Sequence, residues 1–450
     1  MSKPRLTEGP VGRQLVDLTV PMLFGIATMM GQTVLDAWFL GQVGDRELAA
    51  HGFGFPIIMI VTSVAIGLGA GTSSVVARAI GANDPRRARR LSTDSLILSF
   101  LVTIVVAAIG VATIDPLFRL LGAPDDMLPM IRSFMTILYA GVPFIVVGMV
   151  GMSAMRATGN SALPGKILVA GAFLHVLIAP VLIFGFGPVS ALGLDGAAVA
   201  NFISRGAVFA AAMYFMVRHM DLVSMNKPRM DEWRSSCGDI LHVGIPAAGT
   251  NAIVPVGAAL VTAMVAQYGP EAVAGFGVAS RIENLVLVVF YAMSSIIGPF
   301  VGQNLAAGRE DRIHRALKLC TYACLGFGLG TAVLLLGLSW TLPGLFSDSP
   351  EVQDVTRLFL WIVPISYGTY GMVMVMNATF NGVGDPLPGV WVSTGRVLFL
   401  YVPIAGILGG FYGLVGIFVA YSIANLVSGF GSYVWATRIV RKRCAIAAAT

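Results

Sequence analysis

Long apolar stretches separated by short polar stretches run through the whole chain. A helix needs about 20 apolar residues to cross a bilayer, and the pattern contains twelve stretches of that kind. They lie near residues 15–40, 53–80, 92–116, 130–156, 164–186, 194–217, 238–266, 273–303, 315–341, 352–381, 387–409 and 412–438. The short alternating strands of a membrane β-barrel are not visible in the sequence. The pattern therefore predicts an all-α polytopic membrane protein.

The second half of the chain repeats the first half at an offset of about 225 residues. Pro246 falls on Pro21. Toward the C-terminus the offset falls to about 220, where residues 413–416 match residues 193–196. Repeated halves in a membrane protein are typical of transporters whose two lobes move around a shared site. A duplicated scaffold without a transport role is the alternative.

We expect the domains to follow this repeat. Residues 1–217 are predicted to form an N-lobe with helices one to six, and residues 237–450 a C-lobe with helices seven to twelve. Between them, residues 218–236 are polar and basic, and are predicted to be a cytoplasmic linker.

Composition supports the membrane class and narrows the function. Hydrophobic residues make up 56% of the chain and charged residues 12%, about half the charge of a soluble domain; the mean hydropathy is +0.82. No phosphate-binding loop is present, so energy for transport must come from an ion gradient or a partner. The four cysteines have no accompanying ligand set and are expected to serve packing. We therefore predict a transporter rather than an enzyme, without a cofactor, metal site or catalytic residue, acting as a monomer.

Lysine and arginine gather in alternate loops. The loops of one side hold Lys3, Arg5, Arg13, Arg86, Arg87, Arg89, Arg90, Lys227, Arg229, Arg234, Arg309, Arg312, Arg315, Arg441, Lys442 and Arg443. Since basic loops stay in the cytoplasm, both termini are predicted to be cytoplasmic, in the cell (inner) membrane. The net charge of +6 reflects this topology, and no nucleic-acid partner is expected because the basic residues are spread over many loops.

Several motifs, in order along both halves, resemble those of multidrug and toxic-compound extrusion (MATE) transporters. They are Pro21 to Gly44 with Asp36 and Phe39-Leu40-Gly41, Gly67-Leu68-Gly69, Gly81-Ala82-Asn83, Arg156-Ala157-Thr158-Gly159, Arg281-Ile282-Glu283, Gly302-Gln303-Asn304 and Asn381-Gly382. The resemblance implies two six-helix lobes forming a V-shaped central cavity. It also implies a secondary active antiporter for multidrug efflux, which exports cationic or amphipathic compounds (xenobiotics among them) against inward H⁺ or Na⁺ flow.

Asp36 is the main candidate for ion coupling. An ionisable residue within a membrane span costs about 3 kcal/mol or more, so its presence calls for a reason. Gln32 and Thr33 lie one turn earlier on the same helix face, and Pro21 gives this helix a place to bend. In the family the matching aspartate couples to the ion; the alternative is a carboxyl that only bonds a neighbouring helix. Its repeat partner is Val261, so coupling is expected in the N-lobe alone.

The fifth predicted helix departs from part of the family. Many relatives carry an Asn and an Asp four residues apart at positions where this chain has His175 and Ala179. Na⁺ needs several oxygen ligands, so their loss favours H⁺ as the coupling ion. His175 could share a proton with Asp36 because histidine titrates near neutrality, or it could simply bond within a packed bundle. Asn201 matches a family position near the ion site.

Candidate substrate contacts are adaptable apolar and aromatic groups. Methionine suits a promiscuous surface, although in a membrane helix it more often serves packing. Glu283, in the eighth helix, is either a second protonatable site or a structural hydrogen-bonding group, and Arg205 is expected to be structural, near the cytoplasmic end of its helix. The candidates for the substrate cavity are Met29, Met30, Tyr139, Glu283, Tyr367, Tyr370 and Asn377.

The sequence leaves alternatives for the branch of the family and for the function. NorM-like relatives carry acids near the positions of Val254 and Tyr370, which places this chain closer to the DinF-like branch. Proton-coupled export is favoured over Na⁺-coupled export. A lipid-linked substrate flippase would need a strongly basic cavity, whereas the helices offer only scattered arginines such as Arg205 and Arg396. A proton-conducting subunit would need a line of buried Lys, Glu and His, which the sequence lacks.

Overall fold

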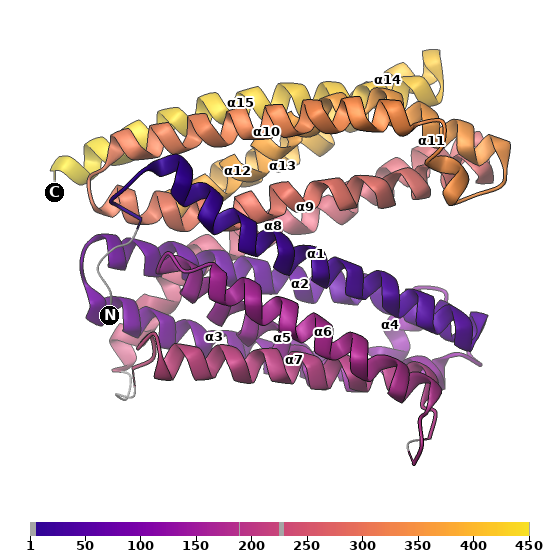
Figure 1. Cartoon of the computed structure of the whole chain (residues 1–450), viewed down its shortest axis with the longest axis horizontal. Helices are drawn as coiled ribbons and strands as arrows, with labels where there is room; N and C mark the ends of the chain where they lie inside the picture. Colours follow the sequence, from indigo (N-terminus) through magenta and orange to yellow (C-terminus); the bar gives the residue numbers. More distant parts are fainter. Residues whose placement is uncertain (1–5, 189, 225–228, 450) are drawn as a thin grey trace. The chain divides into compact units, whose positions relative to one another are not determined.

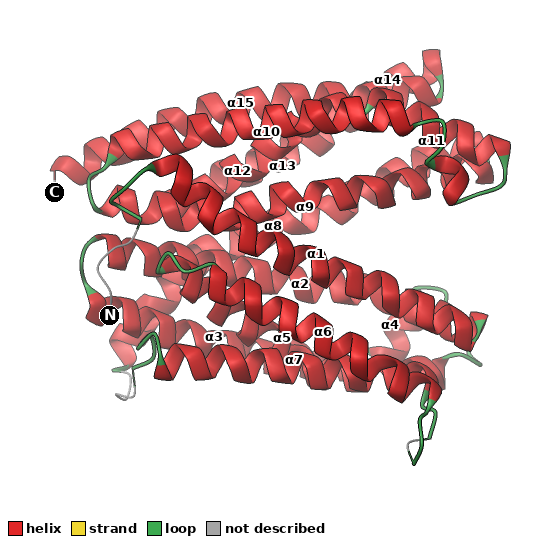
Figure 2. Cartoon of the chain, viewed as in Figure 1, coloured by secondary structure: helices red, strands yellow, loops and turns green. Residues whose placement is uncertain are grey.

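The computed structural model describes residues 6–188, 190–224 and 229–449, and they are almost entirely helical (Figure 2). Lys3, Arg5 and Lys227 of the charge pattern lie outside these residues. The helices, coloured along the chain in Figure 1, are α1 (Val11–Val43), α2 (Asp45–Gly81), α3 (Pro85–Ala112), α4 (Ile114–Leu120), α5 (Leu128–Ala157), α6 (Ala162–Phe184), α7 (Gly193–Arg218), α8 (Met230–Val265), α9 (Pro270–Ala306), α10 (Glu310–Leu338), α11 (Pro350–Ile362), α12 (Tyr367–Val383), α13 (Leu387–Thr394), α14 (Val402–Tyr412) and α15 (Leu414–Ala449).

The predicted twelve membrane helices are confirmed. Among the described residues, 12 helices are long and apolar enough to cross a membrane, and each overlaps one predicted stretch. The tenth span, Pro350–Val383, is broken by a 3₁₀ turn at Pro364–Ser366, because Pro364 has no N–H for the helix ladder. The eleventh span contains a π-helical segment at Gly395–Tyr401. The short helix α4 lies between two spans and was not predicted.

The helices pack into two compact units, which we call unit 1 and unit 2. In unit 1, α5 packs against α2, α3 and α7, and α6 packs against α7. Glycines bring backbones together in this unit: a Cβ on Gly165 of α6 would lie 2.4 Å from the carbonyl oxygen of Pro21 in α1. Small residues of this kind are typical of close helix crossings in membranes.

Unit 2 is built in the same way. Its α12 packs against α9, α10 and α15, and α14 packs against α15. Phe359 and Phe418 meet edge to face with ring centroids 5.2 Å apart. A Cβ on Gly382 would lie 2.5 Å from the carbonyl oxygen of Gly298, so α9 and α12 also cross with no side chain between their backbones.

The two units do not coincide with the predicted lobes. Among the described residues, unit 1 is 20–248 and unit 2 is 6–19 with 249–449. Each boundary falls inside a helix, within three residues of Pro21 in α1 and of Pro246 in α8. The lobes of residues 1–217 and 237–450 remain a prediction from the repeat. Of the predicted linker 218–236, residues 230–236 already belong to α8, and 225–228 lie outside the described residues.

Specific contacts hold the leading segments of α1 and α8 in the units to which they belong. In unit 2, Arg312 of α10 binds the N-terminal segment: its Nη2 donates to the carbonyl of Leu6 (3.0 Å) and to Gln14 Oε1 (2.8 Å), and its Nη1 donates to the carbonyl of Gly9 (2.6 Å). In unit 1, a Cβ on Gly71 of α2 would lie 2.3 Å from the carbonyl oxygen of Ile240 in α8. The leading part of each repeat's first helix, residues 11–19 of α1 and 230–248 of α8, therefore belongs to the other unit.

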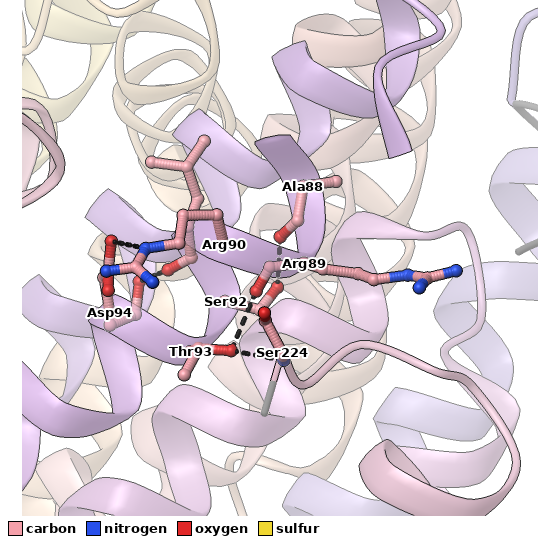
Figure 3. Close-up of polar contacts among 9 residues, drawn as sticks. Ala88, Arg89, Arg90, Ser92, Thr93, Asp94 and Ser224 are labelled. Carbon is pink, nitrogen blue, oxygen red and sulfur yellow. Dashed lines mark hydrogen bonds and ion pairs between the residues drawn. The ribbon is translucent and has the colours of Figure 1, made fainter. Parts of the chain in front are cut away.

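The basic start of α3 is held by local pairs (Figure 3). Arg90 Nε donates to Asp94 Oδ2 at 3.0 Å, and this carboxyl is buried. The backbone N–H of Ser224 donates to Thr93 Oγ1 at 2.8 Å (Figure 3), which ties the segment after α7 to α3. At least one arginine of this basic cluster, Arg90, therefore has a structural role at this end of unit 1.

Candidate ion and substrate site

Asp36 of α1 and His175 of α6 meet inside unit 1. The His175 Nε2 lies 2.6 Å from Asp36 Oδ1, a length typical of a hydrogen bond assisted by charge. Both side chains are buried, with 0% of His175 and 8% of Asp36 exposed. The structure thus brings together Asp36 and His175, for which the sequence left open a shared proton or a purely structural hydrogen bond.

Ser204 of α7 contacts the other ring nitrogen of His175. Its hydroxyl donates to the backbone carbonyl of Asn201 at 3.0 Å, and its oxygen lies 3.2 Å from His175 Nδ1. In the tautomer that carries its proton on Nδ1, the serine oxygen accepts from His175 Nδ1–H while its own hydroxyl donates to Asn201. A hydrogen bond at Nε2 then needs a further proton, either on the imidazole or on Asp36. In either form the pair holds one proton more than a neutral Nδ1–H imidazole beside a carboxylate.

Of the other predicted coupling residues, some lie near this pair and one does not. Gln32 is buried and lines a small pocket, with room of the order of one water molecule. Thr33 is exposed, and its hydroxyl donates to the carbonyl of Met29 (3.4 Å), so the structure does not bring it to Asp36. Asn201 meets the pair through its backbone carbonyl, by way of Ser204. The pocket is lined by Met29, Gln32, Leu168, Gly171, Ala172, Ser204, Arg205 and Val208.

Two basic residues near Asp36 were missed as site residues. His51 of α2 and Arg205 of α7 both interact electrostatically with Asp36. The His51 ring lies 5.6 Å from the Phe134 ring, and its buried Nδ1 has no hydrogen-bond partner among the described residues. His51 falls on Phe276 in the repeat, and a polar residue opposite an apolar repeat partner is the signal that could have indicated it.

The predicted substrate residues are divided between the two units. Met29 lines the unit 1 pocket, Met30 is half-buried, and Tyr139 is only 3% exposed within the unit 1 core. Tyr139 packs so tightly on Gly110 that a Cβ there would lie 2.2 Å from its ring. Glu283, Tyr367, Tyr370 and Asn377 belong to unit 2.

In unit 2 these residues join a buried polar network. Tyr421 donates its hydroxyl to Glu283 Oε1 at 2.9 Å. Arg396, on the π-helical segment, donates to Asn425 Oδ1 at 2.9 Å and stacks over Tyr370 at 4.5 Å. π-Helical segments frequently mark functional sites.

Tyr367 and Asn377 lie elsewhere in the same unit. Tyr367 is fully buried, and its hydroxyl has no partner among the described residues. Asn377 Nδ2 donates to Ser393 Oγ at 2.9 Å. The side chain of Asn377 is therefore directed at a neighbouring helix, α13.

Comparison with known proteins agrees with this architecture. The family model described as MatE matches residues 21–181 and 246–407, once in each half of the chain. The chain belongs to the MatE family. MatE proteins are transporters rather than enzymes, and this member is a multi-pass membrane protein with 12 apolar helices among its described residues.

Individual relatives match over nearly the full length. The chain is 34% identical to a protein named "FAD transporter" from Shewanella oneidensis, over 96% of both chains. It is 25% identical to "Probable multidrug resistance protein YoeA" of Bacillus subtilis, over 94% of both. Among solved structures, the Vibrio cholerae MATE transporter VcmN in the bent form superposes with a TM-score of 0.91 at 29% identity, covering 96% of this chain and 98% of that one.

Proposed function

We propose that this MatE protein is a secondary active antiporter that exports cationic or amphipathic organic compounds in exchange for protons, with Asp36 and His175 as the proton-carrying pair. The observation that carries this proposal is the buried 2.6 Å contact between His175 Nε2 and Asp36 Oδ1. It supports proton coupling because, in the tautomer whose Nδ1–H donates to Ser204, a hydrogen bond at Nε2 needs an additional proton on the pair.

Loss of that proton removes the contact. With His175 Nδ1–H held by Ser204, the deprotonated pair presents a nitrogen lone pair to a carboxylate, and the two repel. Asp36 then separates from His175, and α1 loses this hydrogen bond to α6. A proline inside α1, Pro21, lies at the point where this helix passes between units, so a change in bend is expected there.

Na⁺ coupling is the alternative ion. A sodium site needs several oxygen ligands, but the predicted contributor Thr33 is exposed and bonded to its own helix. At Asp36 Oδ1 the neighbouring group is an imidazole nitrogen. One shared proton satisfies this pair without further ligands.

A flavin dinucleotide is a second candidate substrate. The relative named as an FAD transporter is 34% identical to this chain, whereas the probable multidrug resistance relative is 25% identical. FAD carries phosphate groups, so a protein that exports FAD would export an anion rather than the predicted cationic compound. Because the sequence identity to the relative named as an FAD transporter is the higher of the two, FAD should be tested as a substrate beside cationic dyes.

Three further expectations belong to this proposal. The absence of acids at Val254 and Tyr370 supports the DinF-like branch. Lipid-linked substrates remain the alternative cargo. The clustering of Lys and Arg in alternate loops supports cytoplasmic termini.

Transport in everted membrane vesicles tests the function. Vesicles that contain the protein are given an imposed pH gradient, and uptake of ethidium and of FAD is compared with uptake by vesicles lacking it. We expect uptake of at least one compound to start with the gradient and to collapse with a protonophore. Uptake that is independent of the proton gradient and that saturates with Na⁺ concentration at fixed pH would show Na⁺ to be the coupling ion instead.

A further inference from the structure

Arg205 lies in the middle of a membrane helix. It is 12 residues after the start of α7 at Gly193 and 13 before its end at Arg218, or about 18 and 20 Å from the two ends. The sequence expectation of a place near the cytoplasmic end is therefore wrong. A charge at this depth costs about 3 kcal/mol or more, so a function or a partner has to offset it.

The structure gives Arg205 no such partner. Its Nε is buried without a hydrogen-bond partner, and no ion pair joins it to a carboxylate among the described residues. It lines the pocket beside Gln32, with apolar groups such as Met29 and Val208 around it. Arg205 is the charged residue of this lining, and it faces the helix turn that precedes Asp36.

The neighbouring proton-carrying pair changes its charge with its proton. While the proton is held, an imidazolium beside a carboxylate and an imidazole beside a carboxylic acid both sum to zero. After release, the pair carries one negative charge on Asp36, buried and repelled by His175 Nε2. A buried carboxylate without a counter-charge is unfavourable, so proton release requires a cation close to its new position.

Two basic groups interact with Asp36 besides His175, namely His51 from α2 and Arg205 from α7. His51 can supply positive charge only by binding a proton of its own. Arg205 is charged at every accessible pH. The chain also brings Arg205 close, because the preceding residue, Ser204, contacts His175, and Gln32 lies one turn before Asp36.

We propose that Arg205 is the partner that Asp36 takes when the Asp36–His175 pair releases its proton. Asp36 alternates between His175 in the proton-loaded state, described here, and the guanidinium of Arg205 in the unloaded state. Arg205 is a positioning residue that makes release possible. The inference rests on the proposed proton coupling, and it explains why the Arg205 guanidinium lacks a carboxylate partner while the His175 contact is made.

Titration of the pair in purified protein tests this directly. Protein labelled with nitrogen-15 histidine is placed in lipid nanodiscs, and the His175 signal is assigned by its loss in His175→Gln. Its titration midpoint is compared among wild type, Arg205→Gln, Arg205→Lys and the control Arg218→Gln, an exposed arginine at the end of the same helix. An opposite charge within ion-pair distance moves a titration by about one to three pH units.

We expect Arg205→Gln to move the midpoint upward by about one to three pH units, while Arg205→Lys and Arg218→Gln stay near wild type. In vesicles, Arg205→Gln should transport only when the compartment that receives the proton is made more alkaline. An unchanged midpoint in Arg205→Gln, or equal shifts in the Lys and Gln variants, would overturn the inference. Failure of the proton-coupling proposal looks different, since Asp36→Asn would then transport at the wild-type rate whatever the Arg205 variants do.

Discussion

The imidazole of His175 lies between the Asp36 carboxyl, 2.6 Å from Nε2, and the Ser204 hydroxyl, 3.2 Å from Nδ1. These three residues come from α1, α6 and α7, so one ring connects three helices of unit 1. A hydrogen bond at Nε2 needs a proton between the two residues, so this link between α1 and α6 depends on that proton, whereas the packing of Gly165 on Pro21 does not.

Asp36→Asn should abolish gradient-driven export while leaving folding intact. The amide keeps the size of the carboxyl but cannot carry the coupled proton. We expect the initial rate of dye uptake in everted vesicles to fall at least about tenfold, with wild-type amounts of protein in the membrane. Asp17→Asn is the matched control, since Asp17 is an exposed carboxyl on the same helix. Equal rates for Asp36→Asn and wild type would refute the coupling role.

His175→Ala should slow export and change its pH profile. Without the imidazole, Asp36 loses its proton-sharing partner and faces a cavity, so proton loading depends on the carboxyl alone. We expect the rate to fall several-fold and the pH optimum of dye uptake to move. His242→Ala, at an exposed histidine of α8, should match wild type in both respects. The proposed sharing would be contradicted by a His175→Ala profile that overlays the wild-type profile.

Transport should follow the pH gradient and persist without Na⁺. In the proposed antiport the pair loads its proton from outside, so raising the external pH lowers the loaded fraction and slows export. We expect dye export from energised cells to decline as external pH rises at constant internal pH, and to be unchanged when Na⁺ is replaced by choline. A strict requirement for Na⁺ in this experiment would favour the sodium alternative.

Gly165→Ala should destabilise unit 1. The added Cβ would lie 2.4 Å from the carbonyl oxygen of Pro21 and 2.8 Å from its carbonyl carbon, and backbone atoms cannot rotate away. We expect a loss of about 1–3 kcal/mol, seen as a lower unfolding temperature in detergent. Gly31→Ala is the control, because a Cβ there meets nothing within 4 Å. Identical unfolding temperatures for the two variants would contradict the close crossing.

Arg312→Ala should release the N-terminal segment from unit 2. The guanidinium binds the carbonyls of Leu6 and Gly9 and the side chain of Gln14, so its loss removes several hydrogen bonds at once. We expect trypsin to cleave after the exposed Arg13 faster in the variant than in wild type. The released peptide is measured by mass spectrometry. Arg315→Ala, an exposed arginine on the same helix, should leave the rate unchanged. Equal cleavage in both variants would mean that Arg312 does not hold the segment.

The spans could be predicted from the sequence because length and hydropathy alone determine whether a helix crosses a bilayer. Asp36 was predictable for a related reason, since a carboxyl is conspicuous in an apolar stretch. The role of Ser204 was not, although it lies three residues after Asn201 and thus on the same helix face. Hydropathy does not reveal how a helix is rotated about its axis, and that rotation decides which of Asn201, Ser204 and Arg205 meets the pair.

Breaks within helices were harder to predict than the helices themselves. Pro364 interrupts its span with a 3₁₀ turn, whereas Pro21 and Pro56 lie within continuous helices. The sequence does not distinguish these cases, because neighbouring helices decide whether the freed carbonyls find other donors. The unit boundaries inside α1 and α8 were missed for a similar reason: the repeat marks equivalent residues, but not which helices they pack against.

Because the leading segments of α1 and α8 belong to the opposite units, neither sequence repeat contains all the residues that its own core needs. A fragment that stops at Arg218 would leave the surface at Gly71, which receives Ile240, without its cover. A fragment that starts at Met230 would lack the segment that Arg312 grips. Cutting the chain between Arg218 and Met230 would give two fragments, and each would need a helix segment of the other to complete its core.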